Sequence, residues 1–173
     1  MILVRHGESE FNVVYSVTRV DPGIRDPGLT GEGRRQVAEV APALDGRAID
    51  RIVTSPYRRA LETADIVASA IGAPVTVDRI IGERKLFTCD IGSPRSELAA
   101  RWPGFDFGPL AEEWWPAEGE SDDALMARCS SFRAAAMTLP AHDAIVVITH
   151  WGVIRALTGA VAANGEAIAF DPQ

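Results

Sequence analysis

Two of the chain's three histidines, His6 and His150, each stand one residue beyond a short apolar run, and arginines accompany them. Arg5 precedes His6, and Arg59 lies a few residues beyond a third apolar run. Imidazole supplies nitrogens that can attack an electrophile or transfer a proton, and the planar guanidinium group binds phosphate in a bidentate manner. These residue types predict a site that binds a phosphoryl group and acts on it.

The elements that must position these residues are short strands alternating with helices. Continuous apolar runs at 2–4, 52–54, 75–77 and 144–149 are typical of strands buried on both faces. Between them, apolar residues recur at steps of three and four, which indicates amphipathic helices, and Ser55-Pro56 fits an N-cap followed by a first-turn proline. We therefore expect a three-layer α/β domain, its mostly parallel sheet covered by helices on both faces. The carboxyl ends of parallel strands would bring the histidines and arginines to one edge.

Length and composition predict one globular domain over residues 1–173. The 173 residues are 47% hydrophobic and 24% charged, which is ordinary for a soluble protein with its own core. Residues 79–121, rich in glycine, proline and tryptophan, predict an irregular lid or insertion over the sheet. No apolar run is long enough to cross a membrane, and two widely separated cysteines fit a reduced, cytoplasmic protein. The oligomeric state stays open between monomer and homodimer.

The charge balance restricts the partners. Twenty-four acidic against 17 basic residues give a net charge of −7, which argues against nucleic acid or an anionic membrane as partner. Only Lys85 among the basic residues is a lysine, so an anion site must be built from arginine, and no phosphate-binding Walker loop is present. No metal-site motif is present, and we expect no metal and no cofactor. The expected partner is a small-molecule phosphate monoester.

Several sequence blocks, in chain order, resemble the histidine phosphatase superfamily, which includes cofactor-dependent phosphoglycerate mutase. The blocks are Arg5-His6-Gly7-Glu8-Ser9 with Asn12, Leu29-Thr30 with Gly33 and Gln36, Ser55 with Arg59-Ala60 and Thr63-Ala64, Gly82-Glu83-Arg84, Gly119-Glu120-Ser121 with Arg128, and Thr149-His150 with Gly152. The resemblance implies a phosphoglycerate mutase-like fold. It also implies a metal-independent phosphatase that hydrolyses monoesters through a phosphohistidine intermediate.

The resemblance also implies a role for each residue of the site. His6 would be the nucleophile, with its other ring nitrogen held by a backbone carbonyl. Arg5, Arg59 and His150 would surround the phosphoryl oxygens, with Asn12 and Gly152 completing the phosphate site. Glu83 would be the general acid and base, although Glu8, Glu112 and Glu113 are alternatives. Glu120 and Arg128 are expected to form an ion pair or a contact at a helix terminus, outside the chemistry.

Tryptophans in the insertion suggest how the substrate is selected. Trp102, Trp114 and Trp115 stand among carboxylates (Glu112, Glu113, Glu118, Glu120, Asp122 and Asp123), and they would form either an acidic, aromatic lid or a cap on the core. An acidic lid would favour a monoester with an apolar, aromatic or cationic group. Trp151 stands where the family's phosphatases often have glycine. Its indole must turn onto the helix or form one wall of the pocket.

Three other functions compete with hydrolysis by histidine. Phosphoglycerate mutase activity is the first alternative, although the chain has no basic insert to hold a carboxylate. A phosphate-binding or docking module without turnover is the second. The third is a cysteine-based phosphatase, because Cys89 and Arg95 have the spacing of that loop. Asp90 and the presence of only one glycine in the loop argue against it.

Overall fold

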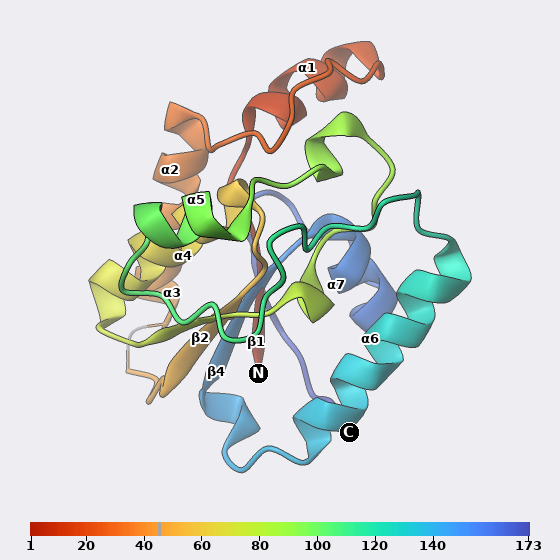
Figure 1. Cartoon of the computed structure of the whole chain (residues 1–173). Coiled ribbons are helices and arrows are strands. Elements are labelled where there is room, and N and C mark those ends of the chain that lie inside the picture. Colours follow the sequence, from red (N-terminus) through yellow and green to blue (C-terminus); the bar gives the residue numbers. More distant parts are fainter. Residues whose placement is uncertain (45) are drawn as a thin grey trace.

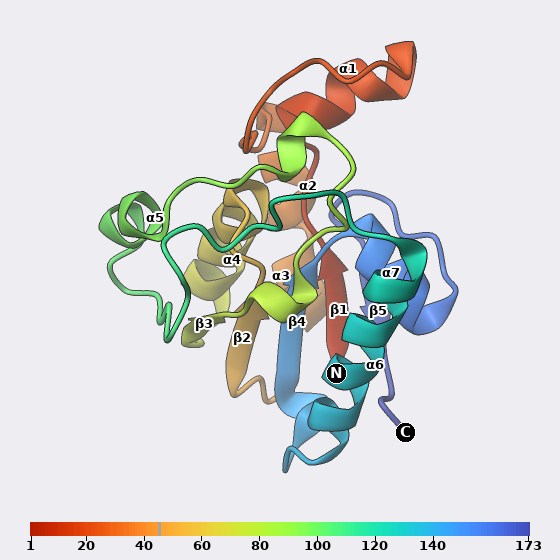
Figure 2. The same cartoon turned by 45° about the vertical axis from the view of Figure 1, so that its right-hand side comes forward.

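The computed structural model describes residues 1–44 and 46–173, and a five-stranded sheet forms its centre. The strand order is β3-β2-β4-β1-β5, with bounds β1 Ile2–Arg5, β2 Arg51–Thr54, β3 Val75–Val77, β4 Ile145–Thr149 and β5 Ala167–Ala169 (Figures 1 and 2). Strands β3, β2, β4 and β1 are parallel, and β5 pairs antiparallel with β1. The predicted mostly parallel α/β sheet is confirmed. Strand β5 was not predicted; it is a three-residue strand at the edge of the sheet, and two of its three residues are exposed.

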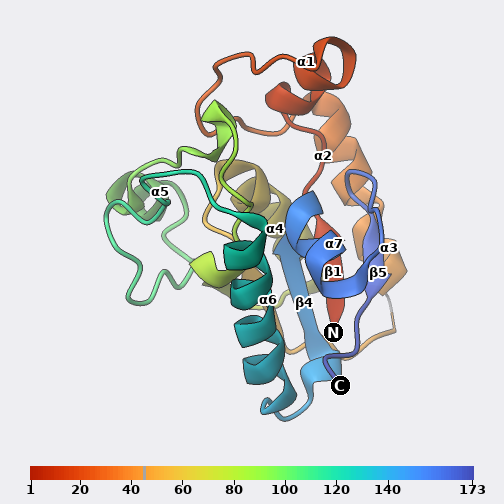
Figure 3. The same ribbon diagram turned by 90° about the vertical axis from the view of Figure 1, so that its right-hand side faces the viewer.

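Helices cover both faces of the sheet, as the buried central strands β1 and β4 require (Figure 3). Successive residues of a strand point to opposite faces, so Leu3 and Val147 pack with α6 (Asp122–Met137) and α7 (Trp151–Thr158). Val4 and Ile148 pack on the other face with α2 (Gly31–Ala38), α3 (Val40–Leu44) and α4 (Arg58–Ile71). Within residues 1–44 and 46–173, no helix combines the length and the apolar character that a membrane crossing requires.

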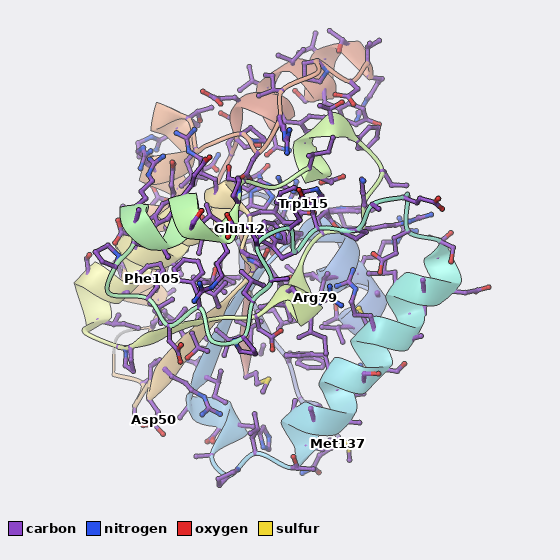
Figure 4. The ribbon with its side chains drawn as sticks, viewed as in Figure 1. Asp50, Arg79, Phe105, Glu112, Trp115 and Met137 are labelled. Carbon is purple, nitrogen blue, oxygen red and sulfur yellow. The ribbon has the colours of Figure 1, made fainter. Side chains whose placement is uncertain are left out.

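The insertion at 79–121 crosses the carboxyl side of the sheet and shares a small core with the α4 region and β3. It contains the 3-10 helices η1 (Arg79–Ile81) and η2 (Thr88–Asp90) and helix α5 (Arg95–Arg101), and Glu112 and Trp115 lie on its extended part (Figure 4). Trp102 and Trp114 are buried against Tyr57 and Leu61 of the α4 region. The indole N–H of Trp114 donates to the carbonyl of Ser93 at 2.9 Å. These two tryptophans therefore hold the insertion to the domain.

Helix α4 begins two residues later than the Ser55-Pro56 pattern predicts. The N-cap is Tyr57, which makes no side-chain capping bond, and the helix starts at Arg58. The amide of Arg58 instead donates to the Asp26 carboxylate at 2.9 Å. The N-cap prediction was wrong because a carboxylate from a distant loop takes the capping role. The Ser55 hydroxyl is thereby left for another partner.

The turn after β1 depends on two glycines that lie against each other. This turn leads from β1 into α1 (Glu10–Thr18), the helix at the top of Figure 1, and it contacts the first turn of α2. A Cβ added at Gly33 would lie 2.0 Å from the carbonyl oxygen of Glu8, and one at Gly7 would lie 2.4 Å from the carbonyl oxygen of Gly33. Since these neighbours are backbone atoms, the turn that follows His6 needs glycine at both positions.

We predict that Gly33→Ala destabilises the protein by about 1–3 kcal/mol, because the new methyl group forces the turn and α2 apart. Gly31→Ala is the matched control, since a Cβ at Gly31 in the same helix meets nothing within 4 Å. That substitution should leave stability unchanged or raise it by up to about 1 kcal/mol. Urea unfolding of both variants measures the difference, and equal stabilities would contradict the close-packing argument.

Candidate active site

A cavity of about 1030 Å³ opens at the carboxyl ends of β1 and β4. Six of the residues that the sequence predicted for the site line it: Arg5, His6, Asn12, Arg59, Glu83 and Gly152. Pairing of β1 with β4 sets Arg5 opposite Thr149, so the two histidines that follow these residues lie side by side. Their ring centroids are 5.1 Å apart.

His6 is held with one ring nitrogen free. Its Nδ1 lies 2.7 Å from the carbonyl oxygen of Gly7, so Nδ1 carries the proton and Nε2 keeps its lone pair. The ring is 4% exposed, and burial, reinforced by the charges of Arg59 and Arg5, lowers the pKa of His6 well below its ordinary value. The imidazole is therefore neutral at neutral pH, as a nitrogen nucleophile must be.

His150 is fully buried beside His6 and does not itself line the cavity. Its Nε2 lies 2.7 Å from the hydroxyl oxygen of Ser55, which also accepts the amide N–H of Tyr57 at 3.4 Å. Among the described residues, Nε2 is the acceptor within reach of the Ser55 proton, which leaves the ring proton on Nδ1. No described residue binds Nδ1, so its proton is a buried donor without a partner in the described part of the chain, next to His6. Burial lowers the pKa of His150 as well, and Arg59 contributes.

The two predicted arginines are anchored differently. Arg59 is 3% exposed and donates to the carbonyl of Cys89 at 2.8 Å and to the carboxylate of Asp90 at 3.0 Å. Arg5 donates through Nη1 to the carbonyl of Ala162 at 2.7 Å. Its buried Nε has no partner in the described part of the chain. Arg5 therefore retains a donor for an anion, whereas Arg59 already has a counter-ion.

Asp90 is a site residue that the sequence analysis did not predict. It is 1% exposed, and besides Arg59 its carboxylate accepts the amides of Leu86 and Phe87 at 3.0 and 3.1 Å. One carboxylate thus fixes both a buried arginine and the segment 86–90 that walls the cavity. No sequence signal marks it, because it pairs across 31 residues from an irregular segment. Its neighbour Cys89 lines the cavity, but burial raises the pKa of the Cys89 thiol and keeps it protonated.

Asn12 is oriented by the same bonds that cap α1. Its Oδ1 accepts the amide and the hydroxyl of Ser9 at 3.0 and 2.9 Å and the side chain of Asn164 at 3.2 Å. The amide oxygen is therefore fully used, and the NH₂ group is the part left for a ligand. Asn164, which also lines the cavity and donates to the His6 carbonyl at 3.1 Å, was not predicted.

Glu83 lies close to the start of α7. Its carboxylate accepts the amide of Arg84 at 2.9 Å and the amide of Gly152 at 3.3 Å, so the Gly152 N–H points to Glu83. A Cβ at Gly152 would lie 2.5 Å from Glu83 Oε1, so glycine permits this approach. Burial, followed by the charge of Asp90, raises the pKa of Glu83. A raised pKa suits a carboxyl group that donates a proton.

Arg128 supports the turn that carries Glu83. It donates to the carbonyls of Ile80 and Gly82 at 2.6 and 2.9 Å and pairs with Glu120 at 2.6 Å, which confirms the predicted ion pair. The alternative acids Glu8, Glu112 and Glu113 do not line the cavity. Glu8 accepts the hydroxyl of Thr30, and Glu112 that of Ser96.

The outer cavity differs from the predicted acidic tryptophan lid. Trp102, Trp114 and Trp115 do not line it, because the first two are core residues and Trp115 packs against them. Its apolar wall comes instead from Phe11, Tyr15, Leu86, Phe87, Met126 and Trp151.

The charges in the cavity also differ from that prediction. Of the six carboxylates expected in the lid, only Asp122 lines the cavity, where it pairs with Arg84. The charged lining consists of five arginines and three carboxylates: Arg5, Arg19, Arg59, Arg84 and Arg155, with Glu83, Asp90 and Asp122.

Comparisons with known proteins agree with this geometry. Residues 1–169 match the family model described as histidine phosphatase superfamily (branch 1). The chain is similar to phosphoglycerate mutase-like protein 4 of Arabidopsis thaliana, with 31% identity over 91% of this chain and 68% of that protein. It is also similar to glucosyl-3-phosphoglycerate phosphatase of Mycolicibacterium vanbaalenii, with 30% identity over 93% and 73%.

The solved structure of a relative has a similar fold. The mycobacterial glucosyl-3-phosphoglycerate phosphatase in complex with VO3 superimposes with a TM-score of 0.63 and 26% identity, covering 92% of this chain and 78% of that one. The family match extends over nearly the whole chain, and four of the six sequence blocks contribute residues to one cavity. The chain therefore belongs to branch 1 of the histidine phosphatase superfamily.

Proposed function

We propose that the protein is a metal-independent phosphatase that hydrolyses small phosphate monoesters through a phosphohistidine on His6. The observation that carries this proposal is the state of His6: a neutral ring with Nδ1 bound by Gly7 and Nε2 free, in a cavity lined by arginines. Relatives at about 30% identity include phosphatases and mutases, so both activities are compatible with the family. Free, buried Cys89 and Cys129 fit a cytoplasmic location.

In the first half of the reaction, Nε2 of His6 attacks phosphorus in line with the departing ester oxygen. The bond from phosphorus to that oxygen breaks as the bond to nitrogen forms, and Glu83 gives its proton to the leaving alcohol. The Nε of Arg5, the NH₂ of Asn12 and the Nδ1–H of His150 are the donors left for the phosphoryl oxygens. Fixed donors of this kind stabilise the charge of a loose transition state.

The second half reverses the role of Glu83. As a carboxylate it takes a proton from water, and the oxygen attacks phosphorus while the bond to His6 breaks. Inorganic phosphate leaves, and His6 returns to its neutral form with its proton still on Nδ1. The positive charges in this scheme come from the arginines, so no step uses a metal ion.

We predict that His6→Ala lowers the rate by at least several orders of magnitude, because the covalent route is lost. Cys89→Ser should keep most of the activity, and phosphoenzyme trapped from the wild type should be acid-labile and alkali-stable, as expected for phosphohistidine. The assay uses a generic aryl phosphate, with and without a chelator, which should make no difference. An inactive Cys89→Ser variant would transfer the chemistry to cysteine. Wild-type protein that binds phosphate without turnover would favour the docking module.

The shifted pKa values predict a bell-shaped dependence of the rate on pH. Activity should fall on the acid side at a pH below 6.5, the ordinary pKa of histidine, because the pKa of His6 is lowered and protonation removes its lone pair. It should fall on the alkaline side at a pH above 4.5, because the raised pKa of Glu83 keeps that acid protonated beyond its usual range. Glu83→Gln should be slow and lack the alkaline limb.

Glu113→Gln is the control for this pH profile, since Glu113 is exposed and does not line the cavity. That variant should keep both limbs. A Glu83→Gln enzyme that retained the alkaline limb would assign the proton transfer to another group.

Hydrolysis should exceed phosphoryl transfer between the positions of phosphoglycerate. A mutase must keep water from the phosphohistidine while the substrate turns. Here Leu86, Met126 and Trp151 are 55%, 49% and 37% exposed at the cavity wall, so the cavity is open. We expect rapid phosphate release from a small monoester, with no activation by 2,3-bisphosphoglycerate. Interconversion faster than phosphate release, and dependent on that primer, would support the mutase alternative.

A further inference from the structure

Two arginines line the outer cavity without a carboxylate partner. Arg155 of α7 lies with its guanidinium carbon 5.1 Å from the centre of the Trp151 ring, and Arg19 lies 5.8 Å from the centre of the Tyr15 ring. Both arginines are exposed, both line the cavity, and neither forms a salt bridge within the described residues. Each is thus a cation held over an aromatic face.

The other cavity charges are already used. Arg59 is paired with Asp90, and Arg84 with Asp122. Glu83 accepts two backbone amides beside the phosphoryl site. Arg5 lies next to His6 in the chain and retains a donor there. Arg155 and Arg19 are therefore the cavity arginines that have neither a carboxylate partner among the described residues nor a part in the proposed chemistry.

Aromatic and other apolar side chains line the same cavity as these arginines and His6. Phe11, Tyr15 and Phe87 form one aromatic group, with ring centroids 5.0–5.4 Å apart. Trp151 and Met126, which line the cavity from α7 and α6, are partly exposed. Exposed apolar surface inside a cavity is suited to covering the apolar part of a ligand.

We propose that the preferred substrate is a phosphate monoester whose alcohol has a flat apolar body and a second, anionic group, which Arg155 and Arg19 bind. This inference rests on the proposed hydrolysis and names its substrate class. A guanidinium group stacked on a ring keeps its edge free, and that edge matches a carboxylate. Stacking also limits the freedom that each arginine would lose on binding. The acidic lid expected from the sequence would have favoured a cationic group on the substrate. The two arginines favour an anionic group instead.

Three aryl esters of similar size test the sign of the preference: phenyl phosphate, 4-carboxyphenyl phosphate and 4-(trimethylammonio)phenyl phosphate. The measured quantity is kcat/KM for each charged ester divided by that for phenyl phosphate, in each enzyme. Comparing these ratios between enzymes cancels the intrinsic reactivity of the esters. Arg155→Gln and Arg19→Gln should each lower the ratio for the carboxylate about fivefold, the upper range for an exposed ion pair, and raise it for the cation.

Arg25→Gln is the matched control. Arg25 is also exposed and stacks on a tryptophan, with its guanidinium carbon 5.5 Å from the centre of the Trp115 ring, but it does not line the cavity. This variant removes the same charge from the same kind of contact, so both ratios should stay at the wild-type value. Equal changes in all three variants would show a general effect of net charge and would overturn the proposal.

Binding of benzylphosphonate and 4-carboxybenzylphosphonate, measured by calorimetry, separates this proposal from the proposed hydrolysis. We expect wild-type protein to bind the carboxylated compound more tightly, and Arg155→Gln to remove most of that difference. Discrimination in binding without turnover of any ester would support the anion subsite and overturn the phosphatase. Turnover of the esters without discrimination in binding would support the phosphatase and overturn the anion subsite. A preference for the cationic ester in the wild type would also overturn the subsite.

Discussion

The buried pair of Arg59 and Asp90 is the interaction on which the site depends. A guanidinium group that is 3% exposed cannot remain charged without a partner, and Asp90, 1% exposed and held by two backbone amides, supplies one. This pairing places a fixed cation near His6 and His150 while both rings stay neutral. Arg5, which has no carboxylate partner among the described residues, then leaves the site with unbalanced positive charge. A bound phosphoryl group would balance it.

Two residues of the family-like sequence blocks, Thr63 and Gln36, support the loop after β1 without lining the cavity themselves. The amide of Gly7 donates to the Thr63 hydroxyl at 3.3 Å, and the amide of Glu8 donates to the Gln36 side chain at 2.9 Å. Helices α2 and α4 thus hold the backbone that carries the carbonyl of Gly7, and this carbonyl sets the tautomer of His6. The position of His6 and the ring nitrogen that it keeps free thus have the same structural cause.

The sequence predicted the site residues that stand at strand ends. It did not predict those that reach the site from irregular segments of the chain. His6 and His150 follow buried strands, so periodicity and the shared edge of parallel strands were enough to bring them together. Asp90 and Asn164 were missed because their partners lie far away in the sequence and no periodic element carries either residue. The tryptophans were ambiguous for a different reason: composition does not distinguish an indole that covers a ligand from one that fills a core. Only the contacts of Trp114 with Tyr57 and Ser93 decide this.

The electrostatic field that a substrate meets differs between the acidic surface of the protein and the arginine-lined cavity. At physiological ionic strength, screening limits the effect of exposed charges to about 8 Å, so the net charge of −7 acts on a substrate mainly outside the cavity. Inside, five arginines face three carboxylates, one of which, Glu83, has a raised pKa. A highly charged polyphosphate is therefore opposed on approach, whereas a monoester with few charges meets a weaker barrier. Once the monoester is inside the cavity, the arginines attract it more strongly, because fewer water molecules separate the charges. A preference for small anions would thus follow from where the arginines lie, and net charge alone does not predict it.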